Sequence, residues 1–303
     1  MKKGGDIFDT TLSDFRSYLK LERSLSDNTI TSYSSDCAKL FGFLKGRGIT
    51  SPENAGIDEL YAFIDSSYAQ GISPRSQARL ISSVKTLFRF LDSEGRLSDN
   101  PCDKIETPKI QRHIPTVLSV EEVTAIIESV DLSRPEGERN RAMLEVLYSC
   151  GLRVSELVNL RISDLFLKEN FIKVTGKGSK QRLVPIGGPA IRHIGLWMDI
   201  RKTWKISREA EDILFVNSRG GKLSRVMVFD VVKAQTAAAG VHKEVSPHTF
   251  RHSFASHLVE NGADLRVVQE MLGHESILTT EIYTHINTKK WQETILKYHP
   301  YHD

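Results

Sequence analysis

Cysteine is scarce in this sequence, and its pattern argues against a fold held together by disulfides. The three cysteines, Cys37, Cys102 and Cys150, are odd in number, lie far apart and form no CxxC pair. Disulfide frameworks use even numbers of closely spaced cysteines and belong to oxidising compartments. We therefore expect a protein that folds around apolar cores in a reducing, cytoplasmic compartment.

Long hydrophobic runs are also missing, which excludes the class of proteins that span a membrane with helices. No run approaches the roughly 20 apolar residues that a bilayer span needs. Residues 1–15 carry two lysines but lack the apolar stretch of a secretory signal. The chain of 303 residues is 40% hydrophobic and 26% charged, which is typical of a globular protein with two domains of ordinary size.

An excess of charge of one sign is nearly absent as well. The chain has 41 basic and 38 acidic residues, for a net charge of +3. Proteins that bind nucleic acid through bulk charge are usually more basic than this. Any surface for phosphate groups must therefore come from the local arrangement of lysines and arginines.

Apolar residues at helical spacing fill the first 108 residues and predict a bundle of four helices. These helices are predicted at 9–23, from 28 to about 46, around 60–64, and from 74 to about 94. A polar, basic segment that ends in a proline, residues 109–115, predicts a linker. The sequence thus divides into 1–108, the linker, and 116–303.

The part from residue 116 onward predicts a mainly helical domain with a small β-sheet. Its predicted helices lie at about 119–130, 139–149, 189–204, 224–239 and 288–297. Phe171–Thr175 and Gln181–Ile186 are rich in β-branched and apolar residues, so they predict a hairpin whose turn presents Lys177. Ile213–Val216 is a further strand candidate. No GxxxxGK[ST] sequence is present, which makes a nucleotide-binding phosphate loop a poor interpretation.

The stretch from Ser246 to Ile286 gathers residue types that can together handle a phosphodiester. Ser246-Pro247 predicts the start of a helix. His248 and Arg251, at i and i+3, then lie on one face of that helix. An arginine fork matches the paired oxygens of a phosphate, and a histidine can donate a hydrogen bond or move a proton near neutral pH.

Two further residues of this stretch extend the set. Gly273 predicts a helix end that leaves His274 on a turn. Tyr283 offers a hydroxyl group as a nucleophile, which needs neighbouring positive charge or a base because its pKa is about 10 in isolation. Upstream, Arg153 stands at the start of another predicted helix.

Each of these residues has a more ordinary explanation when it is taken alone. A His-x-x-Arg pair is most often surface chemistry, and a lone tyrosine is usually half-buried packing. Arg153 can form a surface salt bridge with Glu156 at i+3, and Lys177 can be an ordinary turn residue. Only the joint pattern favours a catalytic set.

A metal site is a further alternative for this helix. His248 and His252, at i and i+4, have the spacing of a zinc-binding pair. Thr249 stands where the zinc-protease motif has a glutamate, however, and no cysteine or carboxylate cluster completes a ligand set. We therefore expect no metal there.

Six residues together resemble the catalytic set of the tyrosine recombinase, or phage integrase, family: Arg153, Lys177, His248, Arg251, His274 and Tyr283. The segments GLRVSEL, GKGSKQRLVP, HTFRHSFASHL and LGHESILTTEIYTHI are similar to the motif boxes of that family. The resemblance covers nearly the whole chain. The LGH…TT.IYTH form and the KYHP ending are most similar to the Xer subfamily, nearer to its XerD branch than to its XerC branch.

The resemblance implies a covalent reaction at DNA. Tyr283 would attack the scissile phosphate and form a 3′-phosphotyrosyl bond. Lys177 would protonate the departing 5′-oxygen, and His248 would assist proton transfer around the nucleophile. Because the covalent link keeps the energy of the broken phosphodiester, rejoining would need no ATP.

The same resemblance assigns the phosphate itself to three other side chains. Arg153 and Arg251 would clamp it and stabilise its transition state, and His274 would donate a further hydrogen bond. Fixed cations aimed at growing charge lower the barrier preferentially. The resemblance therefore implies no metal and no other cofactor.

The family's architecture would make residues 1–108 a helical, SAM-like core-binding domain and residues 116–303 the catalytic domain. The two would form a C-shaped clamp around double-stranded DNA, whose affinity comes mostly from phosphate contacts and falls with salt. Four protomers would exchange strands through a Holliday junction. The tail helix, about 288–297, would dock on a neighbouring protomer, or else pack on its own domain.

The Xer resemblance implies a task and partners. The task would be resolving chromosome dimers at a dif-like site before cell division, with a second Xer-type recombinase and the DNA translocase FtsK as partners. The alternatives are the integrase of a mobile element, a DNA-binding protein that has lost catalysis, and a type IB topoisomerase. The lack of an arm-binding domain ahead of residue 9 favours the Xer interpretation, and the six active-site residues argue against lost catalysis.

Overall fold

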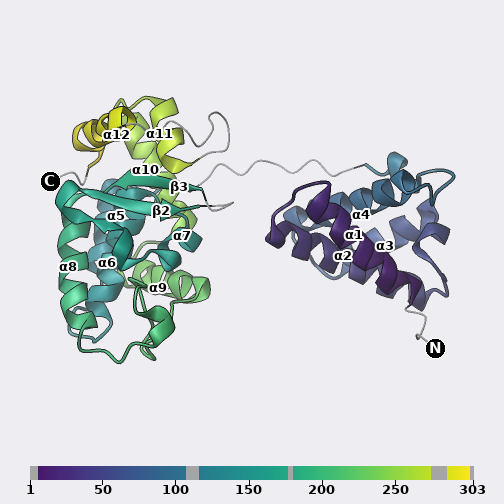
Figure 1. Ribbon diagram of the computed structural model, residues 1–303, viewed down its shortest axis with the longest axis horizontal. Helices are drawn as coiled ribbons and strands as arrows, with labels where there is room; N and C mark the ends of the chain where they lie inside the picture. Colours follow the sequence, from purple (N-terminus) through teal and green to yellow (C-terminus); the bar gives the residue numbers. More distant parts are fainter. Residues whose placement is uncertain (1–5, 107–115, 177–179, 274–284, 301–303) are drawn as a thin grey trace. The chain divides into compact units, whose positions relative to one another are not determined.

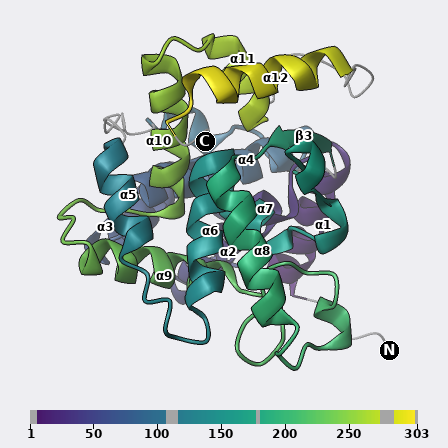
Figure 2. The same ribbon diagram turned by 90° about the vertical axis from the view of Figure 1, so that its left-hand side faces the viewer.

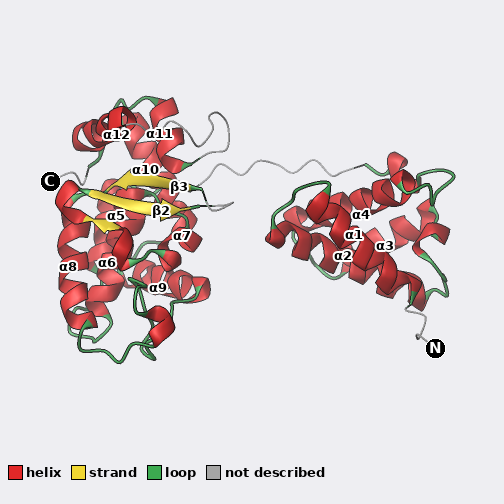
Figure 3. Ribbon diagram, in the orientation of Figure 1, coloured by secondary structure: helices red, strands yellow, loops and turns green. Residues whose placement is uncertain are grey.

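The computed structural model describes residues 6–106, 116–176, 180–273 and 285–300. The chain divides into two compact units, Met1–His113 and Ile114–Asp303 (Figure 1). The predicted fold class, mainly helical with a small β-sheet, is confirmed (Figure 3). Over these described ranges, no helix has the length and apolar character to cross a bilayer. The linker predicted at 109–115 lies outside them.

The first unit is built from four long helices. They are α1 (Ile7–Leu21), α2 (Asp27–Gly46), α3 (Ile57–Ala69) and α4 (Pro74–Ser93), with short 3-10 turns η1 (Pro52–Asn54) and η2 (Pro101–Lys104). The side chains of Ser26 and Ser73 accept hydrogen bonds from the first turns of α2 and α4, which explains where these helices begin. Their apolar stripes meet in one core that includes Phe15, Leu40 and Phe88.

The second unit contains the remaining elements. They are α5 (Val120–Glu128), α6 (Gly137–Cys150), α7 (Val154–Asn159), η3 (Ile162–Asp164), β1 (Leu165–Phe166), η4 (Leu167–Glu169), β2 (Phe171–Thr175), β3 (Gln181–Pro185), α8 (Gly188–Arg201), η6 (Arg208–Ala210), α9 (Arg225–Ala238), α10 (Pro247–Glu260), α11 (Leu265–Leu272) and α12 (His285–Tyr298). Ser119 and Glu122 form the predicted capping box at the start of α5.

Helix α6 is the centre of this unit. Nearly all of its residues are buried, and it contacts α5, α7, α8 and α10. Helices α6 and α8 run side by side in both views (Figures 1 and 2). A helix buried on all sides is a core element rather than a surface helix. The start of α7 lies close to this core helix, because only residues 151–153 separate α7 from the end of α6.

The sheet of the second unit is antiparallel, with the order β1-β2-β3. In the predicted hairpin, Phe171 pairs with Pro185 and Thr175 with Gln181, so this prediction is confirmed. The strand expected at Ile213–Val216 is wrong. That buried segment makes only isolated bridges, from Ile213 to Arg161 and from Val216 to Lys222.

Helix α12 covers the predicted tail helix at 288–297 and contacts α10 and β3 of its own unit. Its Trp291 and Ile295 are buried in the core of the unit. Packing on its own domain, which was the alternative for this helix, is therefore what the single chain displays. Docking on a neighbouring protomer stays a prediction.

Candidate active site

Gly151 ends α6 and brings three elements close together. Its φ of +56° is in the left-handed region, as expected for a glycine that ends a helix. A Cβ atom at this position would lie 2.5 Å from Cδ1 of Phe254 on α10 and 3.0 Å from a methyl carbon of Leu272 on α11. Only a glycine allows the end of α6, the middle of α10 and the end of α11 to meet here.

Arg153 follows two residues later, at the N-cap of α7. Glu156 reaches back and accepts from the backbone N–H of Arg153 through Oε2 (2.9 Å) and from its Nη1 through Oε1 (3.0 Å). Nη2 of Arg153 donates to the carbonyl of Gly273 (3.0 Å). The ordinary explanation of Arg153, a salt bridge with Glu156, is thus present, and the same guanidinium group also binds the end of α11.

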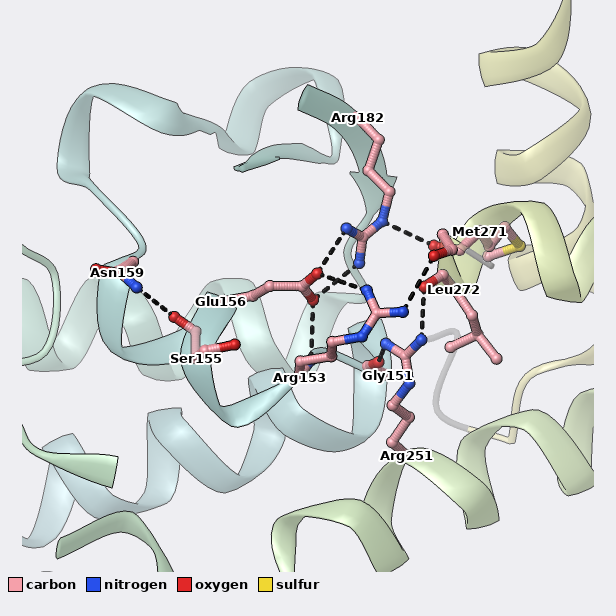
Figure 4. Close-up of polar contacts among 10 residues, drawn as sticks. Gly151, Arg153, Ser155, Glu156, Asn159, Arg182, Arg251, Met271 and Leu272 are labelled. Atoms are coloured by element: carbon pink, nitrogen blue, oxygen red, sulfur yellow. Dashed lines mark hydrogen bonds and ion pairs between the residues drawn. The ribbon is translucent and has the colours of Figure 1, made fainter. Parts of the chain in front are cut away.

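Arg251 lies beside it and comes from α10, which begins with Pro247 after the capping side chain of Ser246, as predicted. Nη1 of Arg251 donates to the carbonyl of Gly151 (2.7 Å) and Nη2 to that of Leu272 (2.5 Å) (Figure 4). Burial and then the charge of Arg153 lower the pKa of Arg251 to about 10. The structure therefore brings the two predicted arginines together.

Arg182, on β3, is a member of this cluster that the sequence analysis missed. Its Nη1 and Nη2 bind the two oxygens of Glu156 (2.8 and 2.9 Å), and its Nε donates to the carbonyl of Met271 (3.0 Å). The strand pattern offered a signal, because residues at i and i+2 share a face and Val184 is buried. That alternation places an arginine at a position facing the core.

The last three carbonyls before His274 each accept from one arginine. Met271 binds Arg182, Leu272 binds Arg251 and Gly273 binds Arg153; Figure 4 shows the arginines converging on this helix end. The final carbonyls of a helix have no partner within the helix. The side chains thus satisfy the end of α11, which stops at Gly273 in the left-handed conformation, as predicted.

His248 occupies the first turn of α10 and is exposed, as is His252, whereas Arg251 is buried. The i, i+3 spacing thus gave the shared helix but not the difference in burial. Lys177 lies outside the described residues. So do His274 and Tyr283, in the stretch 274–284. In the described part of the chain, no group of three or more His, Cys, Asp or Glu side chains is placed to hold a metal ion.

The electrostatics of the cluster favour an anion. Burial alone would raise the pKa of Glu156, but the hydrogen bonds and charge of Arg182 and then of Arg153 outweigh it, so the pKa lies below its ordinary value. Glu156 is therefore ionised at neutral pH and pairs with Arg182. The charges of Arg153 and Arg251 repel each other, and an anion between them would relieve that repulsion.

Comparison with known proteins places this arrangement in a family. Residues 116–290 match the phage integrase family, and residues 12–95 match the N-terminal SAM-like domain of phage integrases. The chain is 42% identical to the tyrosine recombinase XerD of Chlorobaculum tepidum over 96% of each chain. It is 40% identical to XerD of Oceanobacillus iheyensis, over 97% of this chain and 99% of that one.

A solved structure agrees with these relatives. The XerH site-specific recombinase, in its pre-cleavage complex with a difH substrate, superposes with a TM-score of 0.69. The two sequences are 26% identical, and the match covers 96% of this chain and 97% of the XerH chain.

Proposed function

Because this chain belongs to the phage integrase family, as a site-specific tyrosine recombinase most like XerD, we propose that it resolves chromosome dimers at a dif-like DNA site. The identity of 42% and 40% to two XerD relatives, over nearly the whole length of the chain, carries this proposal. The XerH neighbour bound to a difH substrate supports it. The enzyme cleaves and rejoins DNA strands, and the Holliday junction belongs to the proposed reaction.

We assign the binding of the scissile phosphate to the guanidinium groups of Arg153 and Arg251. A guanidinium group carries five N–H donors. The carbonyls of Gly151 and Leu272 occupy two donors of Arg251 within the described part of the chain. Both arginines are fixed before DNA arrives, and their mutual repulsion is relieved when a phosphate binds between them. Preorganised cations of this kind stabilise the charge that grows on the phosphoryl oxygens during attack.

The other roles follow from the family motifs. In this proposal Tyr283 is the nucleophile, Lys177 protonates the 5′-oxygen, His248 assists proton transfer and His274 donates to a phosphate oxygen. The proposed reaction needs neither a metal ion nor ATP, because arginines supply the positive charge and the phosphotyrosyl bond stores the energy of the broken phosphodiester.

The proposed assembly follows the same family. Residues 1–108 form the core-binding domain, 109–115 the linker and 116–303 the catalytic domain, and the two domains clamp the duplex. Four protomers, with a second Xer-type recombinase among them, hold two sites, and the translocase FtsK controls the reaction. Docking of α12 on a neighbouring protomer would couple assembly to activity.

A nicked suicide duplex that carries the host's dif-like sequence tests the chemistry and the site together. We expect a covalent protein–DNA band after denaturing electrophoresis that resists a metal chelator and disappears in Tyr283→Phe. An adduct that requires the second recombinase supports the heterotetramer. Failure to bind this DNA, with binding to the junction DNA of a mobile element, overturns the dif assignment in favour of an element integrase.

A further inference from the structure

The ion pair between Glu156 and Arg182 is the most deeply buried charged pair of the site. Their side chains are only 2% and 5% exposed. Both oxygens of the carboxylate accept from Arg182, and the third nitrogen of that guanidinium group donates to the carbonyl of Met271. All three nitrogens of Arg182 thus bind the protein itself. This geometry points away from a contact with phosphate and towards a supporting role.

The pair contacts one proposed catalytic residue, Arg153, and lies against the glycines that precede two others, Lys177 and His274. Glu156 holds both the backbone and the side chain of Arg153. A Cβ atom on Gly176, the residue before Lys177, would lie 3.5 Å from Oε1 of Glu156 and 3.6 Å from Nη1 of Arg182.

The third contact is at the end of α11. A Cβ atom on Gly273, the residue before His274, would lie 3.5 Å from Cζ, Nε and Nη1 of Arg182. Both glycines therefore lie against one guanidinium group without an intervening side chain. One ion pair therefore lies against the start of α7, the residue that follows β2 and the end of α11, which are far apart in the sequence.

We propose that Arg182 is a positioning residue that, through Glu156 and Met271, sets the relative placement of Arg153, Gly176 and Gly273 around the scissile phosphate. The inference rests on the strand-cleavage chemistry of the proposed function. It adds to the proposed site a residue, Arg182, that does not itself bind the phosphate. Arg182 matters as a planar fork with three engaged nitrogens rather than as a positive charge.

Arg182→Lys tests this distinction, because it keeps the charge and removes the fork. Arg201→Lys is a matched control. Arg201 is also buried in the second unit and caps the carbonyls of Ala210, Glu211 and Ile213, away from the cluster. Both variants lose a buried arginine that binds carbonyls, and only one of them loses the contacts to the site.

Single-turnover cleavage of a suicide duplex gives the first readout, with full-length protein. We expect Arg182→Lys to bind the duplex within about threefold of the parent but to cleave it about 10- to 100-fold more slowly at saturating DNA, as for supporting residues that orient catalytic groups. Arg201→Lys should cleave at the parental rate once its folded fraction is matched. Parental cleavage by Arg182→Lys, or an equal loss in both variants, overturns the inference.

A second readout needs no DNA and so separates this inference from the proposed function. The amides of Arg153, Gly176 and Gly273 are hydrogen-bonded to Glu156 Oε2, the Lys180 carbonyl and the Glu270 carbonyl. Hydrogen exchange measured by NMR should quicken at all three amides in Arg182→Lys, by about tenfold or more, and at none of them in Arg201→Lys. Unchanged exchange at these amides overturns the proposal even if the dif-like duplex is never cleaved.

Discussion

Each unit of this protein buries a carboxylate that pairs with an arginine, and the two pairs differ in what surrounds the arginine. In the first unit, Asp36 is 1% exposed, but its partner Arg79 is 41% exposed, and the hydroxyl of Ser83 also donates to the carboxylate. In the second unit, both Glu156 and Arg182 are almost completely buried. The first pair joins two helices at the protein surface, whereas the second lies inside the proposed catalytic site.

The exposure of the arginine decides how strongly a buried carboxylate depends on that arginine. When one partner is open to solvent, water can replace the lost interaction, and the pair contributes modestly to stability. When both partners are buried and each nitrogen of the guanidinium group has a partner, loss of one partner leaves an uncompensated charge in the interior.

The largest contrast is catalytic. Arg251→Gln should slow single-turnover cleavage by about 10³-fold, because it removes a preorganised donor aimed at the charged transition state. Arg79→Gln in the first unit should leave the rate at saturating DNA unchanged, whatever it does to affinity. Cleavage of a suicide duplex checks both. A rate for Arg251→Gln within a factor of ten of the parent would contradict the assignment of Arg251 to the scissile phosphate.

The next contrast is in stability. Glu156→Gln should lower the free energy of unfolding of the second unit by about 3–5 kcal/mol, because a buried charge loses its partner. Asp36→Asn should cost the first unit about 1–2 kcal/mol, since Arg79 can turn to water. Urea titrations separate the units. Tryptophan fluorescence reports the second unit, which holds Trp197, Trp204 and Trp291, and circular dichroism reports both. Equal losses would contradict the comparison.

Two glycines extend the contrast to the backbone. Gly48 in the first unit and Gly151 in the second both have positive φ angles, +77° and +56°. A Cβ atom at Gly48 meets nothing within 4 Å. Gly48→Ala should therefore lower the free energy of unfolding by only about 1 kcal/mol, because an alanine is strained in the left-handed conformation. Gly151→Ala adds a collision with Phe254 and should cost about 3 kcal/mol or more. Similar costs in denaturant titrations would mean that the elements around Gly151 can move apart.

The smallest effect concerns acid. The pKa of Glu156 is lower in the folded protein than its ordinary value, since Arg182 and Arg153 outweigh burial. Its charge therefore stabilises the fold above the ordinary glutamate pKa of about 4.3, and this share is lost as the pH falls through the lower, folded pKa. The stability gap between the parent and Glu156→Gln should be constant from pH 8 to 5 and narrow below pH 4. A gap that widens in acid would reverse the assigned direction.

The sequence predicted the helical character of the chain and the β2–β3 hairpin, and the i, i+3 spacing offered the pairing of Arg153 with Glu156 as the ordinary explanation of Arg153. These rest on local rules, namely periodicity, capping and the spacing of residues on one helix. The strand expected at Ile213–Val216 was wrong because a short apolar run fits any buried segment. The isolated bridges that it forms depend on partners that only the tertiary fold supplies.

The missed residue, Arg182, teaches a different lesson. Arg182 belongs to the same segment, GKGSKQRLVP, as Lys177, but it lies on β3 and its side chain is buried. Periodicity places it on the buried face, but its partners, Glu156 and Met271, come from α7 and α11. Contacts that join distant segments leave no local signal in the sequence. The sequence pattern therefore did not indicate that Arg182 belongs to the site.

The end of α11 has a consequence for the charge of the site. A helix C-terminus behaves as roughly half a unit of negative charge, spread over its last carbonyls. It can hold Arg153, Arg182 and Arg251 close together, through the carbonyls of Met271–Gly273, without neutralising them. With Glu156 as the one carboxylate that binds them in the described cluster, about one and a half positive charges are left over. A dipole thus orders the guanidinium groups in advance and leaves their attraction for a phosphodiester in place.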